Sequence, residues 1–266
     1  MKTFEVQKRA CRSGPGKVMG GRRAFTLLEL LVVLGILGLL AGLALPALKG
    51  LGQSNTMAAA SRQLLDDLAL ARLAAISQRT TVYMAFVPPN AGAHLSAGLT
   101  EPQRRQLTNL LGGVHTSYAL LAKRSVGDQP GRESPRFITE WRRLPEGVFI
   151  ATNEFVYLAT ASWNRFVNST NRPLAYEVLP FPTASSPTMP LPCVVFNSQG
   201  QLARGLDEFI TLARGSIFYP KDASGAYVPG APDVREVPPG NSTNLFNRVY
   251  VNWLTGRARA IKPEIQ

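Results

Sequence analysis

The most marked pattern along the chain is a long apolar run that begins close to the N-terminus. Residues 30–48 hold 19 consecutive residues without a charged side chain. As an α-helix this run would be about 28 Å long, close to the hydrocarbon thickness of a membrane. A buried core helix rarely stays apolar on every face for this length, and no clean A-x-A site follows the run as in a cleaved secretory signal. The pattern therefore predicts a membrane-spanning helix, with those two alternatives left open.

The polar positions next to this run predict its orientation. Only Lys49 and Arg62 follow within about 20 residues, and the positive-inside rule then places the N-terminus in the cytoplasm and the rest of the chain outside. The net charge is +12, and residues 1–24 contribute +6 of it, so the charge of the remainder is weak support for a nucleic-acid partner. The cations that precede the run are Lys2, Lys8, Arg9, Arg12, Lys17, Arg22 and Arg23.

A second helical pattern follows, and it is amphipathic. Apolar residues recur at spacings of three and four, and Leu65 and Ile76 widen the stripe. Charged residues, Asp66 and Asp67 among them, lie off this stripe or on its borders. We expect the helix to continue to about Gln78, with residues 49–80 packing on a globular head. The stripe consists of Met57, Ala60, Leu64, Leu68, Ala71 and Ala75.

Residues 81–266 show short apolar runs of strand length separated by turn residues, which predicts an antiparallel sheet. Residues 100–111 start with Thr-Glu-Pro, typical of a helix N-terminus. Five prolines each in residues 180–192 and 220–240 predict loops there. The fold class expected is α+β, a long N-terminal helix packed on an antiparallel sheet. The runs are TVYMAFVP, TSYALLAK, RFITEW, GVFIA, CVVFN, EFITLA, SIFYP and RVYVNWL.

Catalytic chemistry is not expected, since the chain has no motif for a nucleophile, a nucleotide phosphate, a metal or a cofactor. We expect His94 and His115 to be solvated or hydrogen-bonded, and Cys193 to be a buried, inert thiol. Asp66–Asp67 and Asp207–Glu208 are adjacent pairs whose side chains point in different directions. The sequence therefore predicts no enzyme, no catalytic residue, no metal site and no cofactor.

The stretch RRAFTLLELLVVLGILGLLAGLALP resembles the class III signal of type IV prepilins and type II secretion pseudopilins. The resemblance implies that prepilin peptidase cuts between Ala24 and Phe25 and that Phe25 becomes the N-methylated first residue. Glu29 is then the fifth residue of the mature chain, and Pro46 lies where such helices often carry a proline. The family usually has Gly before the cut, so Ala24 implies slower or less complete processing.

Glu29 is a carboxylate at the edge of an apolar run, where it is costly unless it is compensated. Cleavage would free an amino group at Phe25, and this group could pair with Glu29 of a neighbouring subunit and set its axial register. Pairing within one chain, or extension of Glu29 to the lipid headgroups, are the alternatives. Pro46 removes a backbone hydrogen bond and is expected to kink or loosen the helix.

The strand and turn order after residue 144, ending in TGRAR, is similar to the head of GspH/FimT-type minor pseudopilins, and the chain length also fits the Verru_Chthon cassette protein D family. Relative to the heads of those pseudopilins, residues 88–135 and 160–190 look like insertions. The domains expected are a basic leader at 1–24, a transmembrane and assembly helix at 25–48, its amphipathic continuation at 49–80, and a β-rich head at 81–266.

Together the resemblances imply a structural minor pilin or pseudopilin of a type IV pilus or a type II secretion system. The implied partners are the prepilin peptidase/methyltransferase, other pilins in a fibre and inner-membrane lipid. The implied location is the inner membrane, with a single pass and a periplasmic head, and then the fibre. A membrane protein that is never processed is the alternative outside any fibre.

A DNA-binding minor pilin that acts in DNA uptake is the alternative function. Cations near the C-terminus alternate with Tyr250 and Trp253, a pattern that can grip a nucleic-acid backbone. A solvated hairpin face would show the same pattern. The candidate nucleic-acid contacts are Arg248, Arg257, Arg259 and Lys262.

Overall fold

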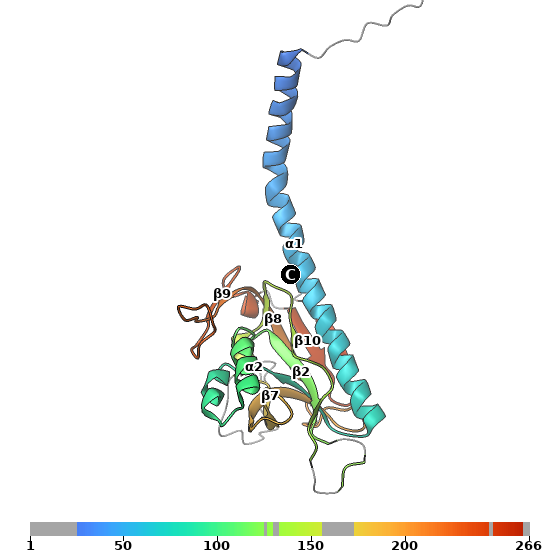
Figure 1. Cartoon of the computed structure of the whole chain (residues 1–266). Coiled ribbons are helices and arrows are strands. Elements are labelled where there is room, and N and C mark those ends of the chain that lie inside the picture. Colours follow the sequence, from blue (N-terminus) through green and yellow to red (C-terminus); the bar gives the residue numbers. More distant parts are fainter. Residues whose placement is uncertain (1–25, 125–126, 130–132, 156–172, 245–246, 263–266) are drawn as a thin grey trace, which may run out of the picture. The chain divides into compact units, whose positions relative to one another are not determined.

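The structure is a computed structural model, shown in Figure 1. It describes residues 26–124, 127–129, 133–155, 173–244 and 247–262, without the side chains of residues 43–54 and 244. The chain divides into two compact units, an N-terminal segment, Met1–Lys49, and a head, Gly50–Gln266.

Helix α1, Leu27–Gln78, ends where the sequence pattern predicts. All six residues of the predicted stripe are buried in the core of the head, and Leu65 packs against them. Ile76 is 38% exposed, so it widens the stripe less than expected. Asp67, which the pattern places off the stripe or on its border, is buried as well. Among the helices of the described residues, none has a stretch long and apolar enough to cross a membrane.

The first antiparallel sheet is built around β1, which pairs with β2 and β7. Its described strands run in the order β3-β2-β1-β7-β6, with β4 also paired to β2. The strands are β1 (Val82–Phe86), β2 (Ser117–Ala122), β3 (Arg136–Phe137), β4 (Arg142–Arg143), β6 (Ala175–Pro180) and β7 (Thr188–Phe196).

The second antiparallel sheet is built around the long strand β8. Its described strands run in the order β11-β10-β8-β5, and β9 pairs with the far part of β8. The strands are β5 (Val148–Ile150), β8 (Glu208–Phe218), β9 (Asp233–Glu236), β10 (Asn247–Val251) and β11 (Ala258–Ile261).

Helices cover both faces of the first sheet (Figure 1). The part of α1 that belongs to the head packs on one face together with inward residues of the second sheet. Helix α2, Glu101–Leu111, and the 3-10 helix η1, Ala91–Ser96, pack on the other face. Alternate residues of β1 enter these two cores, because successive side chains of a strand point to opposite faces. The remaining short helices are η2 (Thr152–Phe155) and α3 (Asn241–Asn244).

The α+β class is confirmed, and the predicted short helix is α2. There the Oε1 atom of Gln103 accepts a hydrogen bond from the Thr100 backbone N–H at 2.9 Å. The two runs EFITLA and SIFYP are one strand, β8, rather than two.

The predicted loops at 180–192 and 220–240 are wrong in part. β7 already begins at Thr188 although Pro190 and Pro192 lie in it, and β9 lies within the second loop. β1 pairs only with residues 193–196 of β7, so among the described strands these two prolines have a neighbour on one side alone. A strand edge of this kind tolerates a residue without an N–H.

The segment 88–135, expected to be an insertion, is part of the folded core. It supplies β2, which pairs with β1 over the whole of Val82–Phe86. It also supplies α2, whose Leu107, Leu110 and Leu111 are buried against the first sheet. Of the other expected insertion, 160–190, only residues from 173 onward are described, and they supply β6.

Candidate assembly segment and C-terminal basic surface

The start of α1 is held by a side-chain cap. The Thr26 Oγ1 atom accepts a hydrogen bond from the Glu29 backbone N–H at 3.2 Å, and the Thr26 carbonyl accepts the first helical bond from Leu30. Thr26 is therefore the N-cap residue and Glu29 is the third helical residue, the T-x-x-E spacing of a capping box. The sequence reasoning missed this role of Thr26, although the spacing itself signals it.

Glu29 lies in the first turn of α1. A carboxylate at this position interacts favourably with the partial positive charge of a helix N-terminus. This interaction offsets part of the cost of placing a charge beside an apolar run. It does not involve a second chain, so pairing with a neighbour would come in addition to it.

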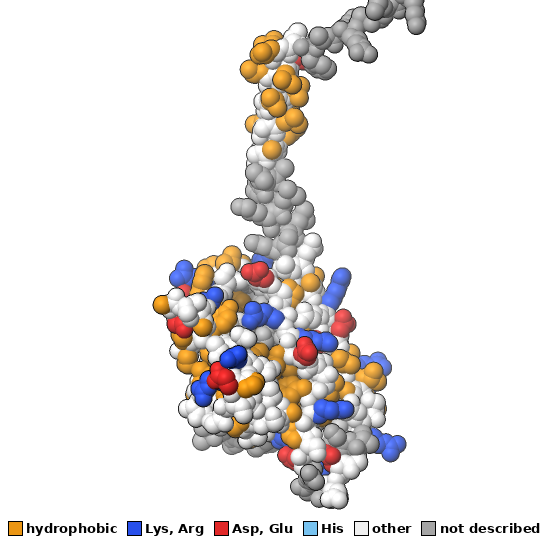
Figure 2. Space-filling view, in the orientation of Figure 1, with side chains coloured by type: hydrophobic (Ala, Val, Ile, Leu, Met, Phe, Trp, Pro, Cys, Tyr) orange, Lys and Arg blue, Asp and Glu red, His pale blue; other side chains and the backbone are white. Residues whose placement is uncertain are grey.

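The apolar side chains at the start of α1, residues 27–42, are uncovered, and Figure 2 shows those on one face of the helix. Every described side chain from residue 26 to residue 42 is exposed; Leu27 is 82% exposed and Leu39 is 67% exposed. A soluble monomer rarely shows so large an apolar surface to water. Another apolar phase, either lipid or further apolar helices, must therefore cover it.

Three residues predicted to act in processing and assembly have no described side chain. Ala24 and Phe25 lie outside the described residues. Pro46 lies within the helical bounds of α1, and its side chain is outside the described part. Their predicted roles stay predictions.

Two of the four predicted nucleic-acid contacts meet at the C-terminal hairpin. Arg257 and Arg259 line a hollow of about 420 Å³ together with Tyr250 and Asn252. The Arg259 guanidinium lies over the Tyr250 ring, 4.9 Å from its centroid. This brings two cations and one aromatic ring together, since β10 and β11 pair Tyr250 with Arg259.

A carboxylate outside the lining is bonded to one of the residues that line this hollow. The Tyr250 hydroxyl donates a hydrogen bond to Asp207 at 3.0 Å, and the Trp253 backbone N–H donates another to Asp207 at 2.8 Å. This negative charge opposes the binding of a phosphate, and Arg259 already covers one face of the Tyr250 ring. The structure thus gives the hollow fewer free binding groups than the sequence pattern suggests.

The other two predicted contacts do not line this hollow. Arg248 is partly buried on β10, where its charge interacts with that of Glu154. Lys262 is exposed beyond the end of β11. A continuous basic surface formed by all four side chains is therefore not observed.

The two histidines differ from each other. The His94 Nε2 atom lies 3.1 Å from the Pro187 carbonyl, so its expected hydrogen bond is present. His115 is buried against Phe155, and its Nδ1 atom has no hydrogen-bond partner among the described residues. One of the two expectations, a solvated His115, is therefore wrong, because the residue is 4% exposed and the Phe155 ring lies against it.

Burial shifts the pKa values of two ionisable groups of the head, Glu154 and His115. Burial raises the pKa of Glu154 to about 7, although Thr211 donates its backbone N–H to this carboxyl at 3.2 Å. Burial lowers the pKa of His115 to about 4. Cys193 is buried as expected, and burial raises the pKa of its thiol. Within the described residues no group of three His, Cys, Asp or Glu side chains could hold a metal ion.

These shifts predict opposite effects on stability. The folded head keeps the Glu154 proton up to pH about 7, whereas the unfolded chain loses it near 4.5, so this carboxyl lowers stability as pH rises through that window. His115 raises stability between about 4 and 6.5, where only the unfolded chain binds its proton. We expect Glu154→Gln to add about 2–3 kcal/mol at pH 8.

Melting temperatures of the wild type and Glu154→Gln between pH 4 and 8 test this prediction. The melting temperature of Glu154→Gln should rise between pH about 4 and 6.5, because of His115, and should not show the fall that Glu154 causes in the wild type. The exposed carboxyl variant Glu146→Gln serves as the control and should follow the wild type. Parallel curves for Glu154→Gln and the wild type would contradict the assignment.

Comparison with known families identifies the N-terminal segment. The Prokaryotic N-terminal methylation motif matches residues 19–45. This chain carries a prepilin-type motif. The match supports the type IV pilin and pseudopilin family, and the motif implies processing by prepilin peptidase and assembly with other pilins. Pilins are structural proteins rather than enzymes.

The motif covers the N-terminal segment and leaves the head outside the match. No curated protein and no solved structure matches the chain. The resemblance of the head to GspH/FimT-type minor pseudopilins therefore rests on the strand and turn pattern alone, and that to the Verru_Chthon cassette protein D family rests on chain length.

Proposed function

We propose that this protein is a minor structural subunit of a type IV pilus or a type II secretion pseudopilus. Residues 25–48 anchor it in the inner membrane by a single pass, with the N-terminus in the cytoplasm and the head in the periplasm. Prepilin peptidase removes residues 1–24, Phe25 is N-methylated, and the N-terminal helix then enters a fibre. The head makes lateral contacts or presents a binding surface.

The methylation motif at residues 19–45 is the observation that carries this proposal. The exposed apolar start of α1 supports it, because lipid before assembly and neighbouring helices after assembly would both cover that surface. The carboxylate of Glu29 supports it further. Cleavage would create an amine at Phe25, only four residues from Glu29 along the helix, so a small axial shift between two packed helices would bring the amine of one subunit to the carboxylate of the next.

The mature N-terminus tests the proposal. Mass spectrometry of the chain from membranes that contain the peptidase should find a polypeptide that begins at N-methylated Phe25. Replacing Ala24 by Gly should increase the processed fraction, because Gly is the residue that the peptidase usually meets before the cut. A native chain that still begins at Met1 would contradict the proposal and favour the unprocessed membrane protein.

A DNA-binding role in uptake is the second candidate, and the pairing of Arg257 and Arg259 beside Tyr250 is the observation that favours it. If the role holds, a gel shift with double-stranded DNA should weaken steeply with salt. The variants Arg257→Ala and Arg259→Ala should each reduce it by about fivefold or more. Lys123→Ala, a cation paired with Glu177 elsewhere on the head, is the matched control. An absent or salt-insensitive shift would remove this role.

A further inference from the structure

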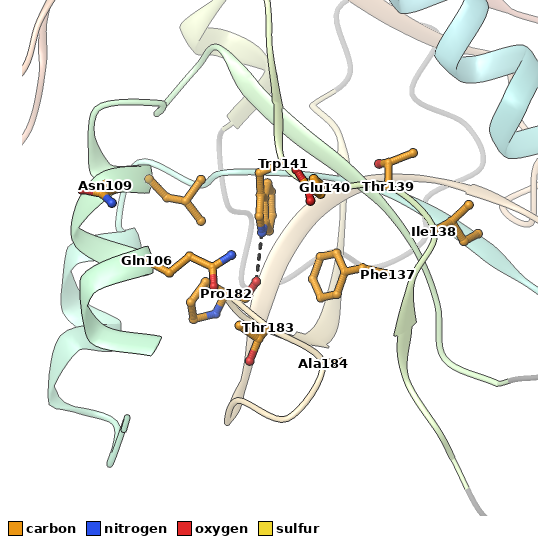
Figure 3. A pocket seen from close by; sticks show the side chains of 11 residues that line it. Gln106, Asn109, Phe137, Ile138, Thr139, Glu140, Trp141, Pro182, Thr183 and Ala184 are labelled. Atoms are coloured by element: carbon orange, nitrogen blue, oxygen red, sulfur yellow. Dashed lines mark hydrogen bonds between the residues drawn. The ribbon is translucent and has the colours of Figure 1, made fainter. Parts of the chain in front are cut away.

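A hollow of the head lies on the face of the first sheet that α2 covers. It measures about 700 Å³ and lies between α2, the segment 137–141 and the loop 182–184 (Figure 3). All of its lining residues belong to the head, and none belongs to the methylation motif or to the C-terminal basic surface. Its volume lies in the range of small-molecule sites, and its lining combines apolar and aromatic side chains with polar ones.

An irregular edge strand builds one wall of this hollow. Leu121 of β2 pairs with Phe137 of β3, and Tyr118 of β2 pairs with Arg142 of β4. The two residues of β2 between these pairs, 119–120, therefore face four residues of the partner segment, 138–141. The backbone N–H groups of residues 138 and 139 both donate to the Leu120 carbonyl, at 2.7 and 3.3 Å. Such a bulge re-aims side chains and recurs beside binding sites. Here it turns Trp141 toward the hollow, whereas the next residue, Arg142, pairs with Asp67 of α1.

Trp141 is held in place before any ligand arrives. Its Nε1 atom donates a hydrogen bond to the Pro182 carbonyl at 2.9 Å, as Figure 3 shows. Its ring meets the Phe181 ring edge-on at 5.3 Å and lies 5.8 Å from the Phe137 ring. An aromatic surface fixed in this way loses little conformational entropy on binding. Together with Phe137, it gives the hollow a rigid apolar wall.

Polar groups of several kinds face this apolar wall. Gln106 and Asn109 are exposed and three residues apart on α2, so they lie on the same side of the helix. Thr183 and Glu140 complete the rim. Amide and hydroxyl groups both donate and accept hydrogen bonds. This set matches a ligand whose own polar groups also donate and accept.

The charge of the lining narrows the ligand class. The chain carries a net charge of +12, yet the lining holds no Lys or Arg and one carboxylate, Glu140. A phosphate, a nucleic acid or an acidic glycan would meet no cation here and would be repelled by that carboxylate. A neutral sugar ring has an apolar C–H face and a rim of hydroxyl groups, the two surfaces that the hollow offers.

We propose that this hollow binds a neutral carbohydrate, with a sugar ring lying on the wall of Trp141 and Phe137 and its hydroxyl groups bonded to Gln106, Asn109 and Glu140. The head would then attach the subunit to a glycan. Carbohydrate binding does not depend on leader cleavage. The binding proposal can therefore fail while the proposed fibre role holds, and the fibre role can fail while the binding proposal holds.

Calorimetric titration of the full chain tests the proposal. The protein is held in a detergent without a sugar headgroup, since a glycoside detergent would compete for the hollow. The probes are cellohexaose, maltohexaose and chitohexaose, with heparin and a neutral hexapeptide as the other ligand classes. At least one neutral oligosaccharide should bind saturably with Kd below about 1 mM, and heparin should not bind in the hollow.

Two exposed positions keep the test independent of folding. The double variant Gln106→Ala, Asn109→Ala should raise Kd at least tenfold, because it removes two hydrogen-bonding side chains and leaves the core intact. Arg105→Ala, an exposed neighbour on α2 outside the hollow, should bind like the wild type. Trp141→Ala should abolish binding, with a melting curve to check its fold. No saturable binding of any neutral sugar, binding that the double variant leaves unchanged, or peptide binding with the same dependence would overturn the proposal.

Discussion

Replacing Glu29 by Gln should leave leader cleavage largely intact and reduce incorporation into fibres by more than about 100-fold. In the proposed function the cut uses the residues around Ala24 and Phe25, whereas assembly would use the pairing of the Glu29 carboxylate with the new amine of Phe25. Removing one member of an ion pair in a low-dielectric helix bundle leaves the other charge unpaired, at a cost of roughly 3–5 kcal/mol. Immunoblots of sheared fibres and of membrane fractions measure the ratio of assembled to unassembled subunit.

Thr26→Ala is the matched control for this prediction. It removes the side-chain cap at the same helix start and leaves the carboxylate in place. Loss of an N-cap costs about 1 kcal/mol, so incorporation should fall by no more than several-fold. Equal losses in Thr26→Ala and Glu29→Gln would show that Glu29 serves the helix start alone. Normal assembly of Glu29→Gln would remove its proposed register role.

Asp67→Ala should lower the stability of the head by about 2–4 kcal/mol. The Tyr118 hydroxyl donates to Asp67 at 2.6 Å, and Arg142 forms an ion pair with the same carboxylate. Burial and the hydrogen bond to Asp67 raise the pKa of Tyr118 above its usual range. Without Asp67 the buried hydroxyl loses its acceptor, and the half-exposed Arg142 loses its partner. The upper half of that range applies only if water cannot replace the carboxylate.

The neighbouring residue provides the control. Asp66 is exposed on α1, so Asp66→Ala should change stability by less than about 0.5 kcal/mol. Thermal unfolding of both variants and the wild type, monitored by near-UV circular dichroism, gives the comparison. Because Arg142 belongs to the bulged edge strand, Asp67→Ala should also loosen the wall that carries Trp141. Equal melting temperatures for the two variants would contradict the role of Asp67.

The path of α1 through the head could be read from the sequence because helix burial is periodic. One face recurs every three or four residues, and the predicted stripe from Met57 to Ala75 is the buried stripe of the structure. The methylation motif is equally local, since its signal lies in consecutive residues. The T-x-x-E spacing of Thr26 and Glu29 is local as well and could have been found with the same rules.

Predictions for the head were wrong where pairing between distant strands overrides the local conformational preference of the residues. Pro190 and Pro192 favour a loop, yet β7 contains them because it pairs with β6 on one side and meets β1 only beyond residue 192. The sequence around Asp67 and Arg142 likewise contains no sign of their ion pair, since 75 residues separate them. Such contacts depend on which strands become neighbours, and no repeat in the chain encodes that choice.

Residue order alone was sufficient for the apolar N-terminal run, the buried stripe of α1 and the α+β class, and it also contains the T-x-x-E helix start that the sequence reasoning missed. The signal for each of these lies in the spacing of residues a few positions apart, although the contacts that bury the stripe and form the sheets join distant segments. The hollow beside Trp141, the separation of Arg248 from Arg257 and Arg259, and the burial of Asp67 and His115 required the folded head. They arise where distant segments meet, and there the packing of the whole sheet, rather than any local preference, selects which side chains are covered.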